Sequence, residues 1–122
     1  MKTPDYKAQD RLHNCGPYAV LNMLLWMGHK RKSLDLYRIE SLLQTDETWG
    51  THEYRLTNCL KDLGLKFTQV RSVKTSGIEK VLAEGGACIY LYMHNRTVGH
   101  YVFIYGQTRK CFLVANDIGR YN

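Results

Sequence analysis

Cys15 has the residue type and setting of a nucleophile. It lies at the start of an apolar stretch that predicts a helix over about residues 15–27, and Gly16 and Pro17 follow it directly. Proline suits the first turn of a helix, where its missing N–H costs nothing. A helix start carries about half a positive charge, which favours thiolate over thiol and lowers the pKa of a cysteine placed there. We therefore expect Cys15 to be an activated thiol.

Three further residues could complete a catalytic site. A thiolate needs a base, a group that orients the base, and donors for an oxyanion. His100 opens a predicted strand and Asp117 follows the next one. In an antiparallel hairpin the end of one strand lies beside the start of the other, so Asp117 could accept a hydrogen bond from His100. Gln9 lies six residues before Cys15, and its amide could donate to the oxyanion together with the Cys15 backbone N–H.

The elements that must position these residues follow a segregated order. Residues 1–14 are expected to be extended or irregular. Apolar residues at helical spacing predict helices over about 15–27, 33–43, 51–64 and 76–84. Alternating or continuous apolar runs predict strands over 65–70, 87–93, 100–105 and 111–115. Helices followed by an antiparallel sheet make an α+β fold. No repeat or linker divides the chain, so residues 1–122 are expected to form a single domain.

Local signals set the predicted ends of these helices. Ser33 and Thr51 are the expected caps of the second and third helices, and Ser76 with Glu79 has the spacing of a capping box. The helices are expected to stop at glycines, which adopt the left-handed conformation of a helix end: Gly28, Gly64 and the pair Gly85-Gly86.

The pattern resembles the bacteriocin-processing double-glycine peptidases, a branch of the papain-like cysteine peptidases. The matching pieces run from Gln9 to Gly119 in the family's order: Gln9, Cys15-Gly16-Pro17, Gly50-Thr51 before a helix that ends at Gly64, Gly99-His100-Tyr101-Val102, and Asn116-Asp117. The resemblance implies a papain-like fold in which the helices pack on the sheet and the cleft lies between them.

The resemblance also assigns roles by position. Cys15 would be the nucleophile, His100 the general base and acid, Asp117 the orienting group and Gln9 the oxyanion donor. Ile118-Gly119 stands where the family usually has Asp-Pro, so Asn116 remains the alternative to Asp117. The implied reaction is hydrolysis of a peptide or isopeptide bond after a small-residue pair such as Gly-Gly, without a cofactor or metal, and the implied partner is a peptide or protein substrate.

Composition and charge bear on three other classes of protein: nucleic-acid binders, zinc proteins and membrane proteins. The 122 residues carry a net charge of +6, but the basic residues are scattered, and the one tight cluster, residues 29–32, lies where the first helix should end. Cations are favourable there, which makes a nucleic-acid partner unlikely. The four cysteines show no Cys-x-x-Cys pair, so a structural zinc site is not expected. The polar N-terminus and the absence of a long apolar run favour a cytoplasmic protein with free thiols and no membrane span.

Several alternatives stay open. Cys15 could be a structural thiol, and the domain could be a catalytically silent module that binds a leader peptide or a protein partner. Cys59, Cys88 and Cys111 fall inside apolar patterns and are expected to be core residues. His13 and His94 are less favoured alternatives to His100 as the base. The sequence leaves the oligomeric state open.

Overall fold

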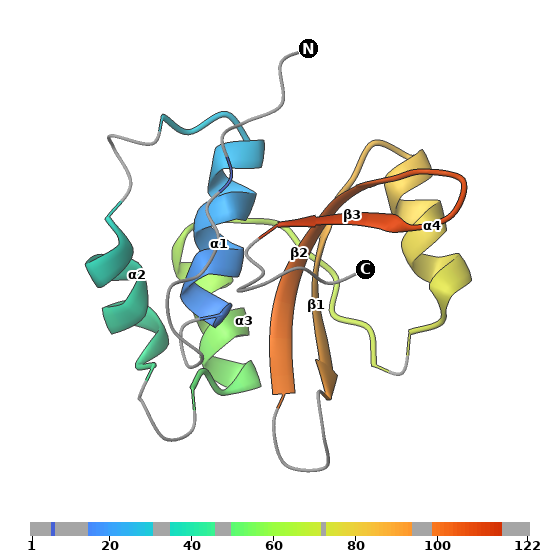
Figure 1. The fold of residues 1–122 in the computed structure, drawn as a ribbon. Helices are drawn as coiled ribbons and strands as arrows, with labels where there is room; N and C mark the ends of the chain where they lie inside the picture. Colours follow the sequence, from blue (N-terminus) through green and yellow to red (C-terminus); the bar gives the residue numbers. More distant parts are fainter. Residues whose placement is uncertain are drawn as a thin grey trace.

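A computed structural model describes Tyr6 and residues 15–30, 35–45, 50–71, 73–93 and 99–115. Within these ranges the order of elements is helical first and β second, as expected for an α+β fold (Figure 1). The helices are α1 (Cys15–Trp26), α2 (Leu36–Leu43), α3 (Glu53–Asp62) and α4 (Thr75–Ala83). The strands are β1 (Cys88–Met93), β2 (Gly99–Gln107) and β3 (Phe112–Ala115).

The described strands form one antiparallel sheet in the order β1-β2-β3, so β2 is the central strand. Consecutive strands are neighbours, as the predicted hairpins require. A register shift between Ile104 and Gly106 marks a bulge in β2 opposite β3. This bulge lets β2 continue to Gln107, two residues beyond the predicted end at residue 105.

Helices cover both faces of the sheet (Figure 1). On one face, α1 packs against β2 and α2, and its apolar side chains join Phe103 and Tyr101 in the main core. On the other face, α4 packs on β2 through Ile78, which contacts Val102 and Ile104. Alternate residues of one strand therefore enter two cores, and β2 is held from both sides.

The first helix is buried on most sides, as the sequence predicted. All its residues from Cys15 to Asn22, and then Leu24 and Leu25, are buried. It ends at Gly28, whose φ of 98° is the left-handed conformation that favours glycine. Gly64 and Gly85 have φ of 75° and 85° and follow α3 and α4 in the same way, so the three predicted glycine stops are confirmed.

Three local predictions were wrong. Residues 65–70 alternate like a strand but pair with no described strand. Thr51 does not cap α3, whose N-cap is His52 without a side-chain hydrogen bond. Ser76 is a residue of α4 itself, and the N-cap is Lys74, again without a side-chain bond. The predicted cap Ser33 lies outside the described residues, and the cap of α2 is Asp35.

Within the described ranges, none of the helices is long and apolar enough to cross a membrane.

The cap at Asp35 gives a test of the helix start. Its Oδ1 accepts hydrogen bonds from the N–H groups of Tyr37 and Arg38 at 3.0 and 3.4 Å. Asp35→Ala removes both bonds, so we expect a loss of about 1 kcal/mol in the free energy of unfolding. Urea denaturation measures it, with Ser33→Ala as the control. An equal or larger loss in Ser33→Ala would contradict the assignment of the cap.

Candidate active site

Cys15 is the first residue of α1, and its sulfur lies against the start of β2. The backbone N–H of Tyr101 donates to Cys15 Sγ at 3.4 Å, an ordinary length for a bond to sulfur. Cys15 is only 5% exposed and belongs to the main core. The contact brings Cys15 against β2 at the residue that follows His100.

Burial decides the protonation of this thiol. Desolvation raises the pKa of Cys15, while backbone hydrogen bonds from Tyr101, Gly16 and Cys15 itself lower it by less. The sequence-based expectation of a lowered pKa was therefore wrong, because a helix start fixes the direction of backbone dipoles but not the loss of water around the sulfur. Burial therefore favours the neutral thiol over the thiolate.

His100 is the second residue of β2 and is 9% exposed. It lies directly opposite Tyr92 of β1 in the sheet register. The two rings are nearly perpendicular, at 81°, with their centroids 5.4 Å apart, which is a favourable edge-to-face arrangement. The imidazole of His100 therefore packs edge-to-face against the ring of Tyr92.

A second contact network surrounds the start of α1. The Tyr101 hydroxyl donates to the carbonyl oxygen of Thr51 at 3.2 Å. Thr51 Oγ1 is 2.7 Å from Thr45 Oγ1, and its side chain fills the space above Gly16, where an added Cβ would come within 2.5 Å of that oxygen. Gly50-Thr51 and Tyr101 were part of the resemblance, but the sequence assigned them no role. Their contacts link distant segments, which no local pattern shows.

The remaining predicted residues lie outside the described ranges: Gln9, Asp117 and its alternative Asn116, and the rival histidines His13 and His94. The described part of β3 ends at Ala115, which pairs with Phe103 of β2. The oxyanion donor and the orienting group therefore stay predictions.

The other cysteines differ in burial. Cys59 is 1% exposed and is a core residue, as predicted. Cys88 is half-buried and packs against the core on the α4 face. Cys111 is exposed, so its assignment to the core was wrong, because the turn before β3 carries it out of the sheet. None of the four forms a disulfide. In the described part of the chain, no group of three or more His, Cys, Asp or Glu could hold a metal ion.

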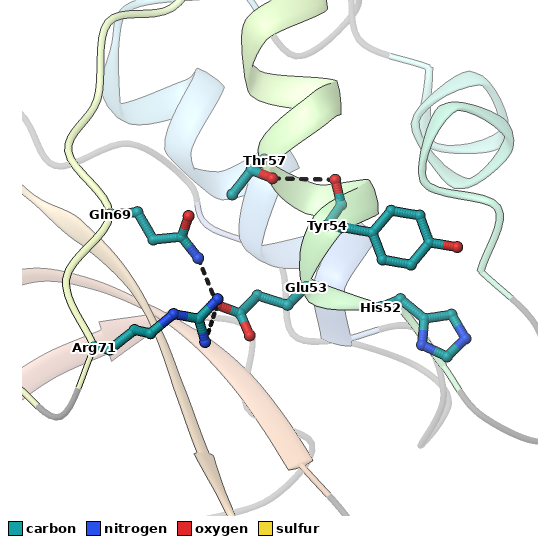
Figure 2. A pocket seen from close by; sticks show the side chains of 6 residues that line it. All are labelled: His52, Glu53, Tyr54, Thr57, Gln69 and Arg71. Carbon is teal, nitrogen blue, oxygen red and sulfur yellow. Dashed lines mark hydrogen bonds and ion pairs between the residues drawn. The ribbon is translucent and has the colours of Figure 1, made fainter.

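A polar hollow of about 400 Å³ opens beside the N-terminal end of α3 (Figure 2). It is lined by His52, Glu53, Tyr54, Thr57, Gln69 and Arg71. Glu53 points across it and pairs with Arg71 at 3.4 Å, and the Gln69 amide donates to the same carboxylate oxygen. Its first lining residue, His52, directly follows Thr51 in the chain, and none of the predicted catalytic residues that the structure describes lines the hollow.

The fold and the position of the cysteine together define a class of protein. A cysteine at the start of a buried helix, next to a histidine-bearing strand of an antiparallel sheet, is the arrangement of papain-like cysteine peptidases. A family model for the peptidase C39 family, the bacteriocin-processing double-glycine peptidases, matches residues 4–121. The chain therefore belongs to this family, which is one of cysteine peptidases. No curated protein gives a significant match.

The close approach at Gly16 predicts a strong effect of Gly16→Ala. The new Cβ would meet the side chain of Thr51, whose own Cβ is 2.8 Å from that point, so either Thr51 or the start of α1 must shift. We expect a loss of about 1–3 kcal/mol in the free energy of unfolding, the usual cost of overpacking. A double-mutant cycle with Thr51→Gly measures the coupling. Purely additive losses would show that the two residues do not clash.

Tyr101 predicts how stability falls at alkaline pH. Burial, and to a smaller extent the charges of Glu53 and Cys15, raises the pKa of Tyr101. The folded protein therefore holds this proton more tightly than the unfolded chain. The stability contribution is complete below about pH 10, the unfolded value, and is lost as the pH rises further. We expect the stability of Tyr101→Phe to fall less steeply than that of wild type as the pH rises above about 10, which urea titrations at several pH values measure.

Proposed function

We propose that this domain hydrolyses a peptide bond with Cys15 as nucleophile and His100 as general base and acid. The observation that carries the proposal is the hydrogen bond from the Tyr101 N–H to Cys15 Sγ. It supports a site in which Cys15 Sγ lies against the backbone of the residue that follows His100.

The proposed chemistry follows from the protonation of the thiol. Because burial favours the neutral form of Cys15, His100 takes the thiol proton as the sulfur attacks the substrate carbonyl. The tetrahedral oxyanion is stabilised by the Cys15 backbone N–H and the side-chain amide of Gln9. His100 then protonates the leaving amine, and water, activated by the same imidazole, hydrolyses the acyl-enzyme and restores the thiol.

Asp117 is proposed to orient His100. This assignment rests on the resemblance to the family and on the pairing of β3, the strand before Asp117, with β2, which carries His100. Asn116 remains the alternative. The substrate is proposed to carry a small-residue pair such as Gly-Gly before the cleaved bond, which rests on membership of the family.

One observation favours a second candidate, a silent module that binds a leader peptide without cleaving it. Cys15 is 5% exposed, and a buried neutral thiol reacts slowly. The two candidates differ in what His100 does to the reactivity of Cys15.

The rate of Cys15 alkylation by iodoacetamide as a function of pH tests the proposal. Peptide mapping by mass spectrometry follows Cys15, and the exposed Cys111 serves as the reference thiol in the same sample. In wild type we expect Cys15 to react faster than Cys111 near neutral pH, because His100 takes the thiol proton as the sulfur attacks. In His100→Ala burial acts without that partner, so the pH at which Cys15 reacts should rise above its ordinary range near 8.5.

A cleavage assay completes the test. A peptide with an internal Gly-Gly should be cut after that pair by wild type, and Cys15→Ser should leave it intact. Binding of the peptide with no cleavage, together with a Cys15 profile unchanged by His100→Ala, would establish the silent module instead.

A further inference from the structure

Tyr101 contacts the proposed nucleophile with its backbone and a different segment with its side chain. Its N–H donates to Cys15 Sγ, and its hydroxyl donates to the carbonyl oxygen of Thr51. The residue is 4% exposed and its ring belongs to the main core. A single residue of β2 therefore joins the start of α1 to the segment that leads into α3.

Thr51, which accepts the hydrogen bond from the Tyr101 hydroxyl, is itself held in place. Thr51 is 8% exposed, its Oγ1 is hydrogen-bonded with Thr45, and its side chain fills the space above Gly16. Because Gly16 directly follows Cys15 in the chain, the contacts close a ring: Cys15 to Tyr101, Tyr101 to Thr51, and Thr51 back to the residue beside Cys15. Displacement of one member must move the others.

The hydrogen bond from the Tyr101 N–H to Cys15 Sγ depends on how accurately these contacts place the N–H. The N–H of Tyr101 lies 3.4 Å from Sγ, and a hydrogen bond weakens steeply as its angle closes. The N–H stabilises a negative sulfur more than a neutral one. A small rotation at the start of β2 would therefore lower the reactivity of Cys15 without removing any group that touches the substrate.

We propose that Tyr101 is a positioning residue, whose hydroxyl bond to the Thr51 carbonyl holds the Tyr101 N–H against Cys15 Sγ. This inference rests on the proposed function, in which Cys15 is the nucleophile. The hydroxyl acts through the backbone and takes no part in proton transfer.

Tyr101→Phe tests the proposal because it removes the hydroxyl and keeps the ring. We expect the midpoint of the Cys15 alkylation profile to rise by about 0.5–1 pH unit, which is a 3- to 10-fold slower reaction near neutral pH. The rate at Cys111 should not change. In the cleavage assay, kcat should fall by a similar factor while KM stays the same, since the Tyr101 hydroxyl contacts no substrate.

Two matched variants separate positioning from general loss of stability. Tyr105→Phe removes a hydroxyl from the same strand, farther from the sulfur, and should leave the Cys15 profile unchanged. Ile78→Val weakens the core on the opposite face of the sheet and should lower the denaturation midpoint without shifting the profile. A shift in either control as large as that in Tyr101→Phe would reduce the role of Tyr101 to stability and overturn the proposal.

The outcomes also distinguish this inference from the proposed function. A Cys15 profile that depends on His100 but is identical in Tyr101→Phe and wild type would overturn the positioning role alone. A profile that His100→Ala does not alter would overturn the proposed function instead. If circular dichroism shows that Tyr101→Phe does not fold, Thr51→Ala decides the matter. It keeps the carbonyl but removes the contact with Thr45, so the profile should rise in the same direction, and no rise would refute the ring of contacts.

Discussion

The candidate site depends on one contact, the hydrogen bond from the Tyr101 N–H to Cys15 Sγ, which joins the start of the central helix to the central strand. It brings together two segments separated by 86 positions in the chain. The contact places the N-terminal end of α1 at the start of β2, the strand whose second residue is His100. The packing of α1 on β2 and of α4 on the opposite face then holds that strand from both sides.

The same contact shows how burial and hydrogen bonding compete at the sulfur. Three backbone N–H groups favour a thiolate, yet the loss of water outweighs them and raises the pKa of Cys15. A buried charge is costly unless it is paired and hydrogen-bonded. The backbone N–H groups supply hydrogen bonds that favour the thiolate, and burial favours the thiol. If the domain is a hydrolase, a positive partner such as an imidazolium would shift this balance toward the thiolate.

The parts of the fold that could be predicted from the sequence are those set by neighbouring residues. Helical spacing located four helices, and Gly28, Gly64 and Gly85 ended three of them because only a left-handed residue was needed there. The capping residues were harder to predict. Thr51 has the chemistry of a cap, but its hydroxyl bonds Thr45 and its side chain packs on Gly16. Residues 65–70 alternate like a strand, but alternation cannot supply a neighbouring strand with which to pair.

The candidate site likewise has parts that could be predicted from the sequence and parts that could not. Helix-start chemistry singled out Cys15, and the resemblance placed it in one site with His100; the structure brings Cys15 against the strand that carries His100. The contributions of Thr51 and Tyr101 could not be predicted, because each acts through a partner far away in the chain. Gly16 shows why such partners matter: it looks like a flexible residue of a helix start, yet the structure needs it because Thr51 occupies the space of its missing side chain. Whether position 16 tolerates a larger residue therefore depends on Thr51, and the surroundings of Cys15 are built by three separate segments of the chain.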